Sequence, residues 1–153
     1  MELWLATEPQ GKVYTDLLGF CEVHCTRASV VLHRGARPSQ EAFDFIDRCH
    51  EFLFDQRQQS SWPGGGTLRG TETVTYFKIC SGFLDMVREA STGLYDWVHP
   101  FLPEDLTFYR DDDTPMLVTI GHERAAFLNL GDAEQRQLLQ SIPELRLTRE
   151  APF

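Results

Sequence analysis

Short alternating runs of hydrophobic and polar residues dominate the start of the chain and predict β-strands there. The pattern places strands at Leu3–Ala6 and over Leu17–His33. In the second segment, cysteine and valine alternate with polar residues from Cys21 to Cys25, and Val30–Leu32 is a short β-rich run. We therefore expect the chain to begin with strands.

Hydrophobic residues then recur every three or four positions, which is the period of an amphipathic helix. One helix is expected over Gln40 to about Gln56. A second is expected from Ser81 until Pro100, since the residue before a proline disfavours helical geometry. A short last helix should open at Asp132, where the sequence has a capping-box pattern, and end at Pro143. The residues expected in the core are Phe45, Ile46, Leu53, Val87, Trp97 and Leu128.

Between the first two helices, the residue composition changes twice. Gln56–Gly66 is polar and rich in glycine, so it favours an exposed connection, or alternatively a mobile recognition loop built around Trp62. Thr67–Cys80 is rich in β-branched and aromatic residues and predicts a central strand.

Three short strands are expected after the second helix. They are Phe108–Arg110, Met116–Ile120 and Ala125–Leu130, separated by Asp111–Pro115 and Gly121–Glu123. Acidic residues and a glycine fit hairpin connections, so this part should form an antiparallel meander.

The order of these elements predicts an α+β fold. We expect a mixed or mainly antiparallel sheet of five to seven strands, with two helices on one face and a short C-terminal helix. Strands and helices do not alternate regularly enough for a doubly wound parallel sheet. The length of 153 residues is near the modal size of one domain, so residues 1–153 should form a single compact domain.

Charge narrows the partners that the protein could have. The net charge of -9 repels phosphate backbones and anionic lipids, so nucleic acid and membranes are not expected as partners. The same charge would speed association with a basic protein. The N-terminal residues resemble neither a secretory signal nor a membrane anchor, which predicts a cytoplasmic location.

The cysteines offer no clear chemistry. Cys21, Cys25, Cys49 and Cys80 lie in apolar patterns, which predicts reduced, buried thiols. On a strand, Cys21 and Cys25 would stand roughly 13 Å apart, with His24 on the other face, so we expect no metal site there. No cofactor motif is present either.

Acidic residues gather on both sides of the strand Leu106–Arg110. Pro103–Asp105 favours at most one helical turn, and Asp111, Asp112 and Asp113 form a turn. Solvated acidic turns or a protein-recognition patch are the interpretations that fit best. Catalysis by such carboxylates would need an apolar setting that raises a pKa.

His122, Glu123 and Arg124 follow a glycine at the end of a strand and form the best single site candidate. They could be an acid/base or anion-contacting cluster, because histidine titrates near neutrality and arginine binds carboxylate or phosphate. The alternative is a structural hairpin turn. The candidate binding residues are therefore Trp62, Glu104, Asp105, Tyr109, Asp111, Asp112, Asp113, His122, Glu123 and Arg124.

As an acidic domain with aromatic residues beside carboxylates, the chain looks like many bacterial immunity proteins and antitoxins, although no motif carries the resemblance. It implies an inhibitory module that neutralises a basic toxin or enzyme by covering its active site. Two alternatives are a small enzyme with a site at residues 122–124 and a homodimeric structural subunit.

Overall fold

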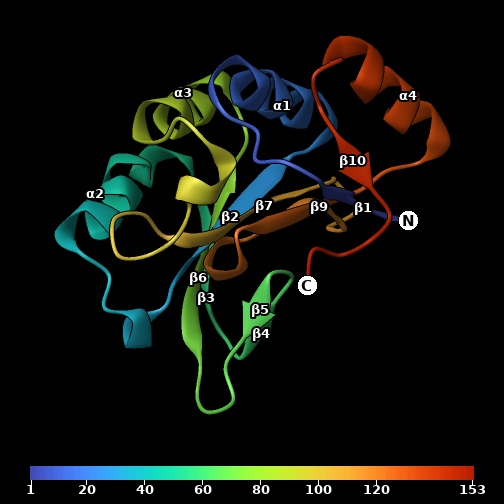
Figure 1. Cartoon of the computed structure of the whole chain (residues 1–153). Coiled ribbons are helices and arrows are strands. Elements are labelled where there is room, and N and C mark those ends of the chain that lie inside the picture. The colour runs from blue at the N-terminus through green and yellow to red at the C-terminus, as the bar shows by residue number, and fades with distance from the viewer.

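The computed structural model describes residues 1–153 as one eight-stranded sheet, a two-stranded hairpin and four α-helices (Figure 1). Every strand pairing is antiparallel, in the order β10-β1-β9-β8-β7-β2-β6-β3. The strands of this sheet are β1 (Glu2–Leu5), β2 (Arg27–Leu32), β3 (Leu53–Gln59), β6 (Glu72–Lys78), β7 (Glu104–Tyr109), β8 (Pro115–Ile120), β9 (Ala125–Asn129) and β10 (Leu147–Thr148). The hairpin is β4 (Ser61–Trp62) and β5 (Gly65–Gly66), and the helices are α1 (Gly11–His24), α2 (Gln40–Arg48), α3 (Ser81–Ala90) and α4 (Asp132–Ser141).

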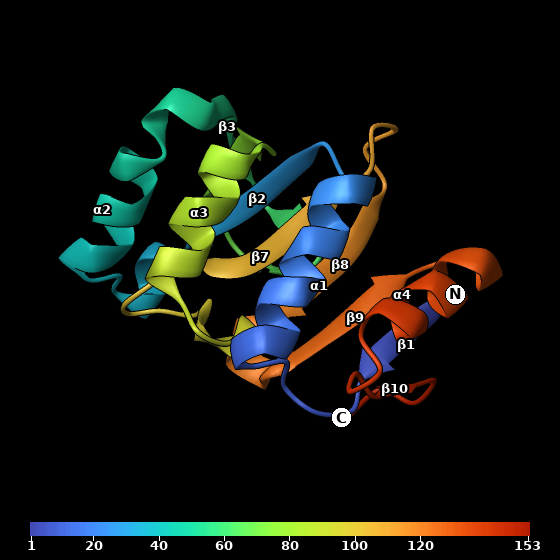
Figure 2. The same cartoon turned by 90° about the horizontal axis from the view of Figure 1, so that it is seen from above.

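The predicted α+β class is confirmed, with a fully antiparallel sheet and a short C-terminal helix. The helices cover one face of the sheet, and Figure 2 shows α1, α2 and α3 side by side there, with α4 over the end formed by β1 and β10. The main core fills the space between helices and sheet.

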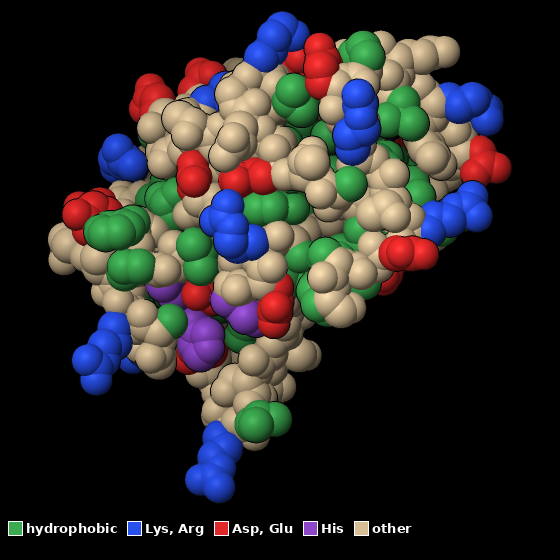
Figure 3. All heavy atoms as spheres, in the orientation of Figure 1, with side chains coloured by type: hydrophobic (Ala, Val, Ile, Leu, Met, Phe, Trp, Pro, Cys, Tyr) green, Lys and Arg blue, Asp and Glu red, His purple; other side chains and the backbone are tan.

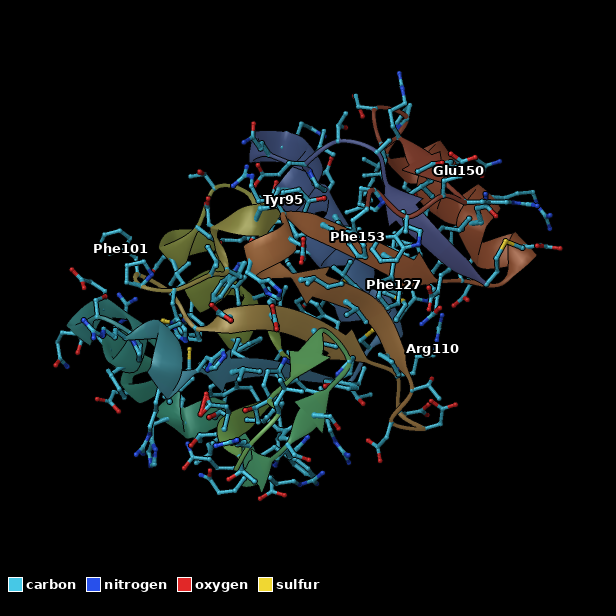
Figure 4. All side chains as sticks on the ribbon, turned by 60° about the horizontal axis from the view of Figure 1, so that its bottom comes forward. Tyr95, Phe101, Arg110, Phe127, Glu150 and Phe153 are labelled. Carbon is cyan, nitrogen blue, oxygen red and sulfur yellow. The ribbon has the colours of Figure 1, made fainter.

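The opposite face of the sheet is covered by two smaller features. The hairpin β4–β5 lies under the sheet, away from the helices (Figure 1). At the β1 end, Phe153 lies against Phe127 (Figure 4), and its ring packs edge-on against Trp4 at 5.4 Å.

The expectation of a strand over Leu17–His33 is wrong for its first half, because Gly11–His24 is helix α1. Its buried residues include Tyr14, Leu17, Leu18 and Cys21, which have helical spacing. Val23, which seemed to continue a strand alternation, is 77% exposed. The second half is confirmed as β2.

The first predicted helix is shorter than its hydrophobic pattern indicated. α2 ends at Arg48, the turn His50–Phe52 is a 3-10 helix, and β3 begins at Leu53. Leu53 is 38% exposed and is not a core residue, and Ile46 is only partly buried. The other four predicted core residues are fully buried: Phe45, Val87, Trp97 and Leu128.

The predicted loop Gln56–Gly66 is mostly exposed, as expected, but it is not a loop, because it contains the end of β3 and the β4–β5 hairpin. β3 is an edge strand whose polar side chains bond to its neighbour β6. Gln56 and Gln58 donate to hydroxyl oxygens of threonines on β6 at 3.0 and 2.8 Å. These bonds hold a strand that has no apolar alternation. β6 lies between β2 and β3, next to the edge rather than in the centre.

The predictions for the second half of the chain are closer to the structure. The meander is confirmed by β7, β8 and β9, although β7 starts at Glu104, where one helical turn was expected. α3 ends at Ala90 and is followed by a separate 3-10 turn at Leu94–Asp96, so the second helix is shorter than predicted. None of the helices combines the length and hydrophobicity needed to cross a bilayer.

Three of the four cysteines are buried, as predicted, and Cys80 is exposed. Burial raises the pKa of the Cys25 and Cys49 thiols to about 12, which disfavours the reactive thiolate. Cys21 and Cys25 are one helical turn apart, since the Cys25 N–H donates to the Cys21 carbonyl at 2.9 Å.

Candidate functional site

A pocket of about 290 Å³ lies between the main sheet and the β4–β5 hairpin. Figure 3 shows histidine side chains gathered beside acidic ones in this region, just above the hairpin. We call it the carboxylate–histidine pocket. Its lining residues are His33, Ala36, Trp62, Gly65, Gly66, Glu104, Asp105 and His122.

A β-bulge at the start of β7 builds the acidic wall of this pocket. Ser29 pairs with Thr107 and Val31 pairs with Glu104, so β7 has one more residue than β2 between the two pairs. Adjacent side chains of a regular strand point to opposite faces, but the bulge lets Glu104 and Asp105 line the same pocket. Asp105 has φ 60°, a left-handed conformation that aspartate tolerates better than most residues.

Two hydrogen bonds fix the Asp105 carboxylate. Its Oδ2 accepts the indole N–H of Trp62 and its Oδ1 accepts the backbone N–H of Gly121, each at 2.8 Å. Gly64 packs directly against this group, since a Cβ there would lie 2.6 Å from the Thr119 carbonyl oxygen and 3.2 Å from the Asp105 Cβ. A side chain at position 64 would therefore displace the backbone or the Asp105 side chain.

Both carboxyl groups are withdrawn from water without a lysine or arginine partner. Glu104 is 5% exposed and Asp105 is 1% exposed. None of the ion pairs in the protein includes either residue. Burial raises the pKa of both groups, and the Asp105 charge raises that of Glu104 further. Hydrogen bonds from Gly121 and Trp62 offset part of the effect on the Asp105 pKa. The pocket thus favours a proton or a cation beside its carboxyl groups.

Histidines approach the pocket from three loops. His122, on the 3-10 turn Gly121–Glu123, places a ring nitrogen with the carboxylate oxygens of Glu104 and Asp105, all within 4.8 Å of one another. His33 contacts Glu72, and its backbone N–H donates to Nε2 of His99 at 2.8 Å. Burial lowers the pKa of His99, which favours its neutral form.

The structure brings together four of the residues singled out from the sequence and separates the others. Trp62, Glu104, Asp105 and His122 share the pocket. The expectation that Glu104 and Asp105 lie in solvated acidic turns is wrong, because both are buried. Trp62 is likewise buried under the sheet rather than displayed on a loop.

The remaining candidates lie elsewhere. Asp111, Asp112 and Asp113 are exposed in the β7–β8 turn, at the far end of β7, and Asp113 pairs with Arg27. Tyr109 is buried, and its hydroxyl bonds to that of Ser29 at 2.8 Å.

The predicted cluster His122-Glu123-Arg124 forms the turn between β8 and β9, and its side chains diverge. Arg124 pairs with Glu8 at 3.0 Å and lies over the Tyr95 ring, away from the pocket. Glu123 is exposed and lies 3.6 Å from the ring of His122. Of the three, only His122 lines the pocket.

Sequence reasoning missed His33, His99 and Glu72, which extend the polar cluster. Each stands alone in its segment, so no spacing signal points to it. The bulge at the start of β7 did have a sequence signal. Pro103-Glu104-Asp105 stands directly before an apolar strand, and aspartate is among the few residues that adopt left-handed geometry.

No protein-family model, no curated protein and no solved structure matches the chain.

Proposed function

We propose that this protein is a binding module whose working site is the carboxylate–histidine pocket, and that the pocket takes up a positively charged group. The observation that carries the proposal is the pair of buried carboxyl groups, Glu104 and Asp105, with no lysine or arginine beside them. Burying a charge costs several kcal/mol unless it is paired, so a cation that enters the pocket would gain much of this energy.

The construction of the site supports a role beyond stability. A bulge, a left-handed aspartate and a close-packed glycine all serve to hold two acids side by side. Such features are costly and cluster at functional sites. Acids with raised pKa values in a pocket are also typical of such sites.

The variant Glu104→Gln tests whether the acid pair lowers the stability of the protein when no ligand is bound. Because the pKa of Glu104 is raised on folding, the stability it provides is complete at acidic pH and is lost as the pH rises through the raised pKa. The charges that face it are Asp105, His33 and His122. We expect Glu104→Gln to be more stable than the wild type at neutral pH, with the difference vanishing at acidic pH, as measured by urea unfolding. Glu51→Gln, at an exposed position, is the matched control and should match the wild type throughout.

The same variant reports on ligand binding. Thermal unfolding of the wild type is measured with agmatine, spermidine, Mg²⁺ or Zn²⁺. A ligand present at a hundred times its Kd raises the free energy of unfolding by about 2.7 kcal/mol. At least one of these cations should raise the Tm of the wild type and of Glu51→Gln but not of Glu104→Gln. If none of them separates the wild type from Glu104→Gln, the proposed function is wrong.

A second candidate function is the inhibitor that covers a basic partner, and a surface on α2 favours it. Glu41, Asp44 and Asp47 line a shallow hollow together with Arg48, and none of the three acids belongs to an ion pair. Phe43 is exposed on the same helix, and Phe101, 65% exposed, lies beside α2 in Figure 4. Trp62 and Tyr109 are buried, so these two phenylalanines are better candidates for aromatic anchors.

Two charge reversals locate such an interface. A basic protein is captured from the native host, and its association rate is measured by biolayer interferometry. Reversal of the α2 acids (Glu41→Lys, Asp44→Lys, Asp47→Lys) should slow association by about tenfold or more, since steering by charge acts on encounter. The turn reversal (Asp111→Lys, Asp112→Lys, Asp113→Lys) is the comparison, and it should have the smaller effect because Asp113 is already paired with Arg27. Equal rates for the wild type and both variants would rule out a partner steered by these acids.

A further inference from the structure

We propose that the cation taken up by the carboxylate–histidine pocket is a divalent transition-metal ion, bound by Glu104, Asp105 and His122. This inference rests on the proposed function and names the ligand of the same site. The sequence predicted no metal site at Cys21, His24 and Cys25, and the ligand set proposed here is a different one. The new ligand set comes from β7 and the β8–β9 turn.

The distances between the three side chains suit a metal ion after a small adjustment. One ligand atom from each residue lies within 4.8 Å of the other two. Ligands at about 2.1 Å from a tetrahedral ion stand roughly 3.4 Å apart, so the group must contract by up to about 1.4 Å. His122 is exposed on a short turn, and rotation of its side chain can supply this movement.

Asp105 is already oriented as a metal ligand would be. A carboxylate has about four acceptor positions, and the bonds from Trp62 and Gly121 use one on each oxygen. The remaining positions are free for an ion. Metal-binding side chains are generally held by such outer hydrogen bonds, which fix their orientation.

Glu104 supplies an independent indication of a ligand. Its side chain is buried, lines the pocket, and makes neither an ion pair nor a hydrogen bond with another side chain. Burial and the Asp105 charge raise its pKa, and the backbone N–H of His99 and the nearby His33 and His122 offset only part of this effect. An ion of charge two would neutralise both Glu104 and Asp105, whereas a lysine side chain would neutralise only one.

The donor types narrow the identity of the ion. An imidazole nitrogen donates a lone pair to a metal ion, and a mixture of carboxylate and imidazole suits zinc, cobalt, manganese or iron. Ca²⁺ prefers six to eight oxygen ligands, and the pocket has no thiol for a soft ion. Three protein ligands would leave one position open, as in catalytic zinc sites.

Titration of the full chain tests the inference. Protein treated with a chelator is titrated with Zn²⁺ by calorimetry and with Co²⁺ by visible absorption. We expect one ion per chain and a Co²⁺ ligand-field band, with affinity reduced at least tenfold in His122→Ala and in Glu104→Gln. Trp62→Phe, which removes one bond to Asp105, should weaken binding by about tenfold to a hundredfold. Glu51→Gln, an exposed acid that does not line the pocket, is the control and should bind as the wild type does.

The outcomes separate this inference from the proposed function. Because Glu104→Gln is expected to be at least as stable as the wild type, its loss of binding cannot be explained by unfolding. If agmatine or spermidine raises the Tm of the wild type through Glu104 while neither Zn²⁺ nor Co²⁺ binds, the metal inference is wrong and the proposed function stands. If neither kind of cation binds, both are wrong. Zn²⁺ bound equally by the wild type and His122→Ala would also overturn the assignment.

Discussion

Replacing Trp97 with alanine should lower the free energy of unfolding by about 3 to 5 kcal/mol, as truncation of large buried side chains does. Trp97 is fully buried and packs edge-on against Phe45 with ring centroids 4.9 Å apart. Its indole N–H donates to the Tyr14 hydroxyl at 2.8 Å, and that hydroxyl bonds to Ser91 at 2.6 Å. The variant therefore leaves a large cavity and removes a buried hydrogen bond between segments distant in sequence.

Urea unfolding measures this loss, and Phe101→Ala is the matched control. Phe101 is also a large aromatic residue and lies four positions after Trp97, but it is exposed. Its truncation should change stability by no more than about 0.5 kcal/mol. A loss below about 1 kcal/mol for Trp97→Ala would contradict the packing described for the core.

A methyl group at Gly121 should have the second large effect and should act on the pocket as well as on stability. A Cβ at this position would overlap the Trp97 carbonyl oxygen and lie 3.0 Å from the Val98 Cβ. The Trp97 carbonyl belongs to the packed backbone and cannot rotate away. Overpacking of this kind costs about 1 to 3 kcal/mol, so we expect Gly121→Ala to be destabilised by that amount. The shift would also move the N–H that binds Asp105 and the turn that carries His122.

Gly19→Ala provides a control of opposite sign. Gly19 lies inside α1, and a Cβ there would have no atom within 4 Å. Alanine is favoured over glycine in a helix by about 1 kcal/mol, so Gly19→Ala should be more stable than the wild type. Urea unfolding of Gly121→Ala and Gly19→Ala gives the comparison. If the two variants have equal free energies of unfolding, the turn at Gly121 is less tightly packed than described.

The parts of the fold that could be predicted are those with a strong local signal. The β7–β8–β9 meander has acidic and glycine turns between β-rich runs, and α2 begins where its hydrophobic period begins. α1 was misassigned because Cys21, Val23 and Cys25 alternate by chance at its end, while the helical set that includes Tyr14 and Leu18 lies further back. β3 was missed since its side chains are held by hydrogen bonds to β6, which local hydrophobicity cannot reveal.

The candidate site could be predicted only as separate residues. Glu104, Asp105 and His122 were each singled out, but as parts of two different features. The bulge that joins the two acids depends on the register between β2 and β7, which is a tertiary property. His33 and His99 reach the cluster from opposite parts of the chain, and neither stands in a motif.

The polar edge strand β3 bears on how the molecule behaves at high concentration. Unpaired backbone groups at a sheet edge are a template on which another strand can add, which leads to aggregation. In β3 the Gln56 N–H is bonded to its neighbour Asp55 at 2.8 Å, and Arg57 pairs with the same carboxylate at 2.7 Å. An incoming strand would have to displace these bonds and bury charged groups. This edge of the sheet is therefore protected against edge-to-edge aggregation.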